Sequence, residues 1–177
     1  MLDIAGHQAA SEFGRRMSRT NPQVQSDARR GARLAAVQAL YQMEMSGGGV
    51  TSTVLEYLNF RLGEDSEVGP LETADADFFR CVVEGVVAEQ ALIDASIKER
   101  LAEGWRLERI DSIVRAAVRA ATYELLRRVD VPVAVVIDEY VGIVNAFFDG
   151  PESGFTNGLL DRLARELNAN DLRQLAC

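Results

Sequence analysis

Three arginines and a tyrosine share one side of a helix that the sequence predicts near residue 30. Arg30, Arg33 and Tyr41 fall within about 80° of one another at ~100° per residue, and Arg29 directly precedes them. Arginine forks bind phosphate through two parallel hydrogen bonds, and a tyrosine ring can stack on an unpaired base. This combination is typical of a single-stranded RNA site. The residues alone leave a second interpretation open, in which Tyr41 packs in the core and the arginines are solvated residues of the first helical turn.

The helix that must position these side chains is predicted from Asp27 to Met43, with Ser26 or Asp27 as its cap and three glycines after it. The segment VDVPVAVVI is rich in β-branched residues, but the helical spacing beyond it favours Pro132 as a helix start. Apolar spacing predicts further helical regions over 51–62, 73–105, 107–128, 132–148 and 155–168. The sequence therefore predicts an all-α, single-domain bundle of about six to seven helices.

Within region 73–105, Thr73 is the expected cap and the inward face is expected to run from Phe78 through Leu92 towards Trp105. Gly85 interrupts this stripe. It indicates either a kink or a close helix contact.

The composition excludes several classes of protein. The chain has 177 residues, 47% of them hydrophobic and 26% charged, which is typical of one globular domain. Its only histidine, His7, lies in a polar leader without a signal-peptide core, and Cys81 and Cys177 have neither zinc-site nor disulfide-framework spacing. The sequence contains no glycine-rich phosphate loop and no apolar stretch of about 18 residues. We therefore expect a cytoplasmic protein that is not an enzyme and that binds no cofactor, metal or membrane.

Charge is distributed unevenly along the chain. Residues 1–35 contain six arginines and three acidic residues, whereas the remainder contains 13 basic and 24 acidic residues, within a net charge of −8. A basic N-terminal segment (1–35) on an otherwise acidic protein predicts two different partners. The basic segment could bind phosphates, and the acidic remainder could bind a basic protein.

Residues 29–42, RRGARLAAVQALYQ, resemble the opening helix of the NusB family of transcription antitermination factors. The resemblance covers about residues 28–168, and several blocks in one register are more specific than any single motif. The later blocks are Phe79-Arg80, Gly85-Val86, Arg109-Ile110-Asp111, Tyr123-Glu124-Leu125, Val131-Pro132, Ile137-Asp138-Glu139 and FTNGLLD at 155–161.

The resemblance implies a helical protein that binds the boxA element of nascent RNA as a heterodimer with ribosomal protein S10, also called NusE. Such a complex helps RNA polymerase to resist termination on ribosomal RNA operons, and other antitermination factors would be contacted indirectly. Asp111 matches an acidic position that faces S10, where Glu is more usual. The residues that the resemblance implies for RNA binding are Arg29, Arg30, Arg33, Gln38, Tyr41, Phe155 and Asn157.

Two departures from the family pattern make the surface more negative: Asp138 replaces an asparagine and Asn145 replaces a lysine. The expected organisation is a flexible basic extension (1–25), a helical RNA-binding domain (26–170) and a C-terminal tail (171–177). One alternative is the accessory RNA-binding domain of an RNA cytosine methyltransferase. This alternative is disfavoured because the chain stops near its last helix, which leaves no room for a cofactor-binding α/β domain. Another is a purely protein-binding module or homodimer that uses the surface around Phe155.

Overall fold

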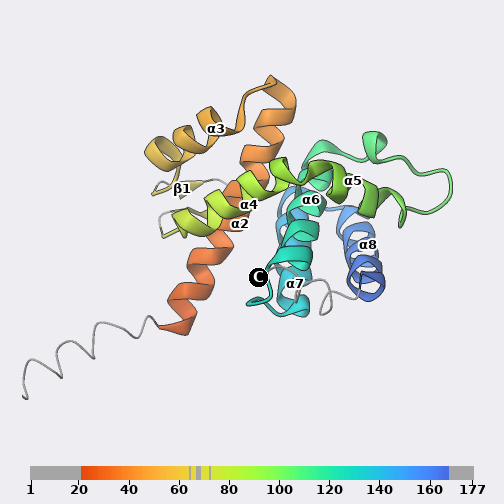
Figure 1. Cartoon of the computed structure of the whole chain (residues 1–177). Helices are drawn as coiled ribbons and strands as arrows, with labels where there is room; N and C mark the ends of the chain where they lie inside the picture. Colours follow the sequence, from red (N-terminus) through yellow and green to blue (C-terminus); the bar gives the residue numbers. More distant parts are fainter. Residues whose placement is uncertain (1–20, 64, 67–68, 72, 168–177) are drawn as a thin grey trace, which may run out of the picture.

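Seven α-helices form the part of the chain that the computed structural model describes, which is residues 21–167 except 64, 67–68 and 72. This arrangement confirms the predicted all-α class, while the expected tail and residues 1–20 of the extension lie outside the described residues (Figure 1). The helices are α2 (Pro22–Ser46), α3 (Val50–Glu56), α4 (Ala76–Ala88), α5 (Gln90–Lys98), α6 (Ser112–Arg127), α7 (Val133–Phe147) and α8 (Glu152–Glu166).

Four short elements, two helical turns and two strands, complete the described structure. Helix α3 continues into a π-helical turn over Tyr57–Arg61, and a 3-10 turn covers Leu107–Arg109. Between the π-helical turn and α4, the two-residue strands β1 (Asp65–Ser66) and β2 (Gly69–Pro70) pair in antiparallel orientation.

Helix α6 lies at the centre of the packing. It contacts α2, α4, α5, α7 and α8, and every residue from Ala116 to Leu126 except Arg119 is buried. Helix α2 packs against α4, α6 and α7, and α7 packs in turn against α8 (Figure 1). The arginines of α2 are therefore placed against the central and C-terminal helices.

The start of α2 differs from the prediction. Asn21 caps the helix by accepting a hydrogen bond from the Gln23 backbone N at 3.1 Å, and Pro22 occupies the first turn, where its missing N–H costs nothing. Residues 22–25 are therefore helical and do not belong to the extension. Asp27 is inside the helix, and Arg29 lies two turns after its start rather than in its first turn.

Other helix boundaries follow from side-chain capping. Asp75, and not Thr73, caps α4 by accepting a hydrogen bond from the Phe78 backbone N at 2.9 Å. Asp111 caps α6 in the same way. Pro132 precedes α7 directly, which confirms that the valine-rich segment starts a helix.

The predicted inward stripe is confirmed in α4 and at the buried Ile93 and Ile97 of α5, and it fails at Leu92 and Trp105. Phe78 is buried as expected, together with Phe79, Val82, Val83 and Val86. Leu92 and Trp105, however, are 49% and 52% exposed. Trp105 leaves the stripe because α5 ends at Lys98 and Gly104 adopts a φ of 84° in the loop that follows.

Gly85 marks a close helix contact. A Cβ built on Gly85 would lie 2.1 Å from Cζ of Tyr123, so α4 and α6 approach each other only because this side chain is absent.

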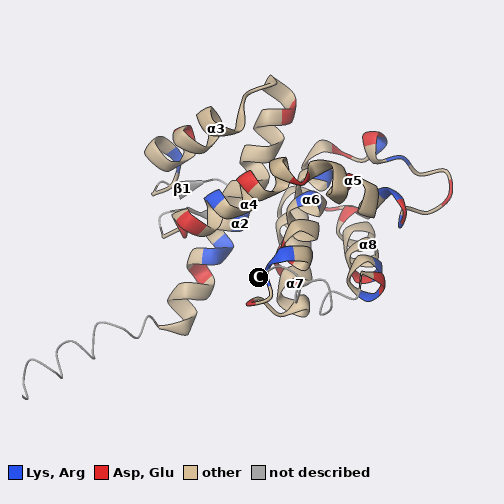
Figure 2. Cartoon of the chain, viewed as in Figure 1, with Lys and Arg blue, Asp and Glu red and all other residues tan. Residues whose placement is uncertain are grey.

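Charged residues of both signs lie close together along α2, α4 and α8 (Figure 2). Within the described ranges, no helix combines the length and the apolar character that crossing a bilayer requires.

Candidate nucleic-acid interface

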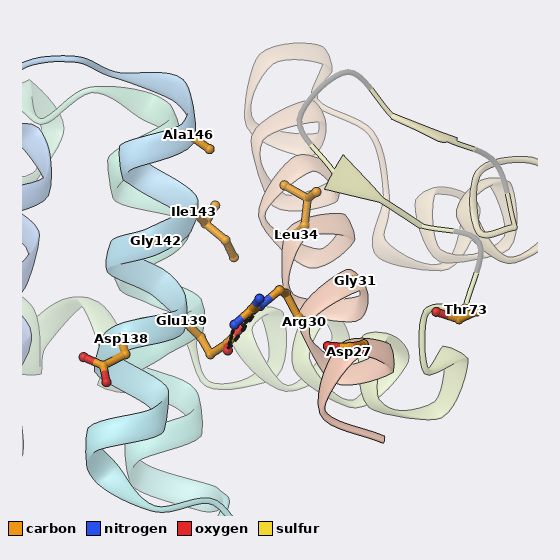
Figure 3. A pocket seen from close by; sticks show the side chains of 10 residues that line it. All are labelled: Asp27, Arg30, Gly31, Leu34, Thr73, Asp138, Glu139, Gly142, Ile143 and Ala146. Atoms are coloured by element: carbon orange, nitrogen blue, oxygen red, sulfur yellow. Dashed lines mark hydrogen bonds and ion pairs between the residues drawn. The ribbon is translucent and has the colours of Figure 1, made fainter. Parts of the chain in front are cut away.

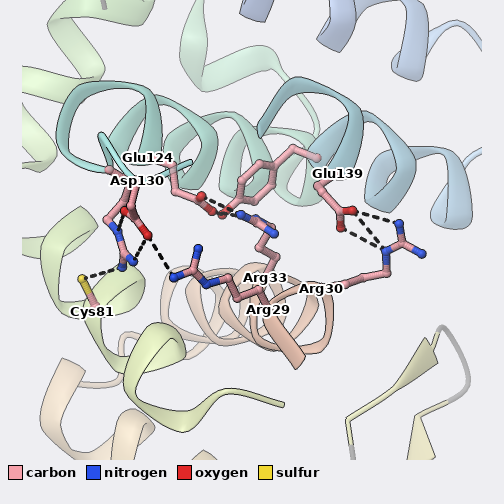
Figure 4. A network of polar contacts seen from close by, with 9 residues as sticks. Arg29, Arg30, Arg33, Cys81, Glu124, Asp130 and Glu139 are labelled. Carbon is pink, nitrogen blue, oxygen red and sulfur yellow. Dashed lines mark hydrogen bonds and ion pairs between the residues drawn. The ribbon is translucent and has the colours of Figure 1, made fainter. Parts of the chain in front are cut away.

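Arg33 is buried against the central helices. It is 2% exposed, and its Nε and Nη2 each donate a hydrogen bond of 2.9 Å to the two carboxylate oxygens of Glu124 on α6. Tyr140 on α7 donates a third hydrogen bond, of 2.8 Å, to Oε1 of Glu124 (Figure 4). The expected direct contact between Arg33 and RNA phosphate does not fit this geometry. The guanidinium of Arg33 already forms its two parallel hydrogen bonds with the buried Glu124 carboxylate.

Sequence reasoning missed Glu124 and Tyr140 as partners of Arg33. Both side chains are fully buried. Burial and the negative charge of Glu124 raise the pKa of Tyr140 well above its ordinary value. Burial opposes the charge of Arg33, but the hydrogen bonds and charge of Glu124 outweigh it and raise the pKa of Arg33. The available signal was an acidic residue within the apolar run of α6, which needs a buried cation.

Arg29 lies beside a second cluster at the end of α6. Its Nη2 is 2.9 Å from Oδ2 of Asp130, and Arg128 binds the same carboxylate through Nε at 2.8 Å and Nη2 at 3.0 Å. The two arginine side chains are 24% and 20% exposed, and Asp130 is 44% exposed. The hydrogen bonds and charge of Arg128 lower the pKa of Asp130 to about 2, with a smaller contribution from Arg29.

Arg30 projects from α2 towards solvent and across to α7. Its side chain is 66% exposed, and its Nη2 lies 2.8 Å from Oε1 of Glu139, which is only 9% exposed. This pair crosses a cavity of about 480 Å³ between α2 and α7 (Figure 3). The cavity is lined by Asp27, Arg30, Gly31, Leu34, Thr73, Asp138, Glu139, Gly142, Ile143 and Ala146.

Gln38 and Tyr41 lie further along α2. Gln38 is partly buried, and Tyr41 is 36% exposed. Tyr41 is therefore not enclosed in the core, and part of its side chain is open to a ligand.

The remaining predicted residues gather around α6 and α8. The half-buried ring of Phe155 stacks on Trp105, with ring centroids 4.9 Å apart and an interplanar angle of 19°. Both rings line a cavity of about 470 Å³ together with Asp111, whose carboxylate accepts a hydrogen bond from the Ile113 backbone N at 2.8 Å. Asn157 is exposed on α8.

The predicted site thus divides into two groups. The α2 residues pack over α6 and α7, whereas Asp111 and Phe155 line a cavity between the start of α6 and the start of α8. Trp105 joins the second group although it was expected in the core. An isolated tryptophan directly after a glycine was the signal for a loop position.

Comparison with known proteins places these features in a family. A model described as the NusB family matches residues 30–165. A protein of Caulobacter vibrioides named transcription antitermination protein NusB is 56% identical over 135 residues, which cover 76% of this chain and 91% of that protein.

Solved structures share the fold. A structure of T. maritima NusB matches with a TM-score of 0.68 and 31% sequence identity, covering 81% of this chain and 96% of that one. A structure of the antitermination factors NusB and NusE in complex with dsRNA matches with a TM-score of 0.64 and 21% identity, covering 78% and 96% of the two chains. The family model and the identity over most of the chain show that this protein belongs to the NusB family.

Proposed function

We propose that this protein is a transcription antitermination factor. It binds boxA-type single-stranded RNA together with ribosomal protein S10 (NusE) and supports transcription of ribosomal RNA operons in the cytoplasm. Family membership supports this proposal, as do the name of the Caulobacter relative and the complex of NusB and NusE with RNA that shares the fold. The observation that carries it is the exposed face of α2 that contains both Arg30 and Tyr41.

The α2 face offers both kinds of contact that single-stranded RNA needs. The Arg30 side chain is 66% exposed, so a phosphate can approach its guanidinium from solvent while Glu139 remains bound to it on the protein side. Tyr41 lies eleven residues further along, about 16 Å away at ~1.5 Å per residue, and offers a ring for base stacking. Arg29 adds a second basic side chain beside Arg30, and Gln38 lies between these residues and Tyr41.

The cavity between the start of α6 and the start of α8 suits the protein partner and the edge of the RNA. Its aromatic pair, Trp105 and Phe155, is bordered by Asp111, which can attract a basic protein such as S10 without leaving its capping position. Asn157 lies two residues after Phe155 at an exposed position of α8 and offers amide groups to RNA. The net charge of −8 also favours a basic protein partner.

A titration tests the proposal. Labelled boxA-like RNA is titrated with the full chain, with and without S10, at about 50 mM and about 200 mM salt. We expect weak binding by the chain alone, tighter binding with S10, and a marked loss at the higher salt concentration. Equal affinity for a scrambled RNA of the same length in the presence of S10 would contradict the boxA assignment.

A second candidate function is a purely protein-binding module or homodimer. The observation that favours it is the exposed Trp105 stacked on Phe155, because exposed aromatic pairs are common at the centres of protein interfaces. An Arg29→Gln/Arg30→Gln variant separates the two. Unchanged RNA affinity in this variant, with self-association that Trp105→Ala abolishes in sedimentation, would favour the second candidate.

A further inference from the structure

Two guanidinium groups from different helices converge on one exposed carboxylate. Arg29 from α2 and Arg128 from the end of α6 both contact Asp130, and Oδ2 of Asp130 lies within 3.0 Å of a nitrogen of each. Asp130 is the most exposed of the three, so the convergence point faces solvent. The geometry resembles two arginines that share one phosphate, because phosphate and carboxylate oxygens accept the same forked hydrogen bonds.

The charges of this network do not balance. Among the described residues, Arg33 is matched by Glu124 and Arg30 by Glu139, whereas Asp130 is the one carboxylate paired with both Arg29 and Arg128, and Nη1 of Arg128 also lies 3.6 Å from Sγ of Cys81. One positive charge is therefore in excess, and it lies at the end of α6.

An aromatic ring holds the two guanidinium groups in place. The Cζ atoms of Arg29 and Arg128 lie 5.1 Å and 4.6 Å from the centroid of the buried Phe78 ring. Guanidinium groups packed over a buried ring lose less freedom when they bind an anion than groups on free side chains do.

We propose that Arg128 is an RNA-phosphate-binding residue that acts as a pair with Arg29, and that Asp130 occupies in the free protein the place of a phosphate oxygen. RNA backbone exchanges with Asp130 or joins it at the two arginines. This inference rests on the proposed RNA-binding function, and it extends the basic surface from α2 to the end of α6. Arg128 is the C-cap residue of α6, a place where a cation is favourable in any case.

Three single substitutions test this pair by the RNA titration described above, with S10 present. Arg128→Gln should weaken RNA binding about five- to tenfold and lower the slope of log affinity against log salt by about one, because one phosphate contact is lost. Asp130→Asn should strengthen RNA binding severalfold, because it removes the competing carboxylate. The matched control is Arg127→Gln, which removes the same charge from the neighbouring residue, where the arginine binds Glu89. It should change affinity less than twofold.

The outcomes separate this inference from the proposed function. It is overturned if Arg128→Gln behaves like Arg127→Gln in affinity and salt slope while the wild-type chain binds RNA. It is also overturned if Asp130→Asn weakens binding, because Asp130 would then position the arginines and not compete with RNA. A wild-type chain that binds no RNA contradicts the proposed function itself. Melting curves set a temperature at which all variants are folded, and Arg128→Lys should recover most of the salt slope.

Discussion

Arg33 and Glu124 are 91 residues apart in the sequence and form a two-pronged ion pair, with side chains that are 3% and 0% exposed. The pair joins α2 to α6, and the Tyr140 hydroxyl from α7 completes it. These contacts therefore fix the relative positions of α2, α6 and α7 beneath the proposed RNA surface. Arg33 contributes to that surface by holding α2 in place, while Arg30 faces solvent and Arg29 is partly exposed on the same helix.

Removal of one partner of this pair should destabilise the protein strongly. Arg33→Ala leaves the Glu124 carboxylate buried without its cation, which typically costs about 3–5 kcal/mol. Urea unfolding followed by circular dichroism measures the change in the free energy of unfolding. The control is Arg165→Ala in α8, whose pair with Asp161 is exposed on both sides and contributes only about 0–1 kcal/mol. Similar losses in the two variants would show that the buried pair is not the main link between α2 and α6.

Gly85 provides a second test of the packing around α6. Gly85→Ala should destabilise the protein by about 1–3 kcal/mol or more, because its new methyl group would overlap the Tyr123 ring. Gly142→Ala is the matched control in α7, where a Cβ meets no atom within 4 Å. It should instead stabilise the helix by up to about 1 kcal/mol. Thermal melts of the two variants should shift in opposite directions.

Most of the fold was predictable from apolar spacing, because each helix buries a stripe at helical intervals. Capping signals were less reliable: Asn21 and Pro22 lie in a polar segment without apolar spacing, so the true start of α2 had no supporting pattern. The stripe towards Trp105 was wrong because helical spacing alone does not show that a helix ends at Lys98.

The candidate site was only partly predictable. Residue type and spacing placed Arg29, Arg30 and Arg33 on neighbouring positions of one helix, but spacing does not identify their partners. Whether an arginine faces solvent or a buried carboxylate depends on contacts across 91 to 109 residues, as in the pairs of Arg33 and Arg30. Such contacts follow from the tertiary packing of α2 on α6 and α7, which local patterns do not contain.

The stability of the protein should depend on pH through Asp130. Its pKa is lowered from 3.8 to about 2 by Arg128 and Arg29, so the folded state favours the ionised carboxylate. The resulting stabilisation is present above about pH 4 and is lost as the pH falls towards 2. Asp130→Asn should therefore show a shallower decrease in melting temperature between pH 4 and pH 2 than the wild type does. Parallel pH profiles for the two proteins would show that this carboxylate has no favourable partner in solution.

The ring of Tyr41 should matter most for unpaired RNA. Tyr41→Ala removes a ring that is open to solvent on α2, and the loss of one stacked base typically costs about 1–3 kcal/mol of binding free energy. Duplex RNA hides its bases within the helix, so its affinity should change little. Fluorescence anisotropy with a single-stranded boxA-like RNA and with the same sequence in a duplex measures the two effects.

Two further variants assign the Tyr41 effect to stacking. Tyr41→Phe keeps the ring and should retain most of the affinity for unpaired RNA, because stacking requires the aromatic face and not the hydroxyl group. Met45→Ala, one turn further along α2 at a position 56% exposed, removes a flexible apolar side chain of similar reach and should leave binding unchanged. If Tyr41→Ala weakens single-stranded and duplex RNA equally, Tyr41 shapes the end of α2 and does not stack on a base. The RNA path along this helix would then have to end at Arg30.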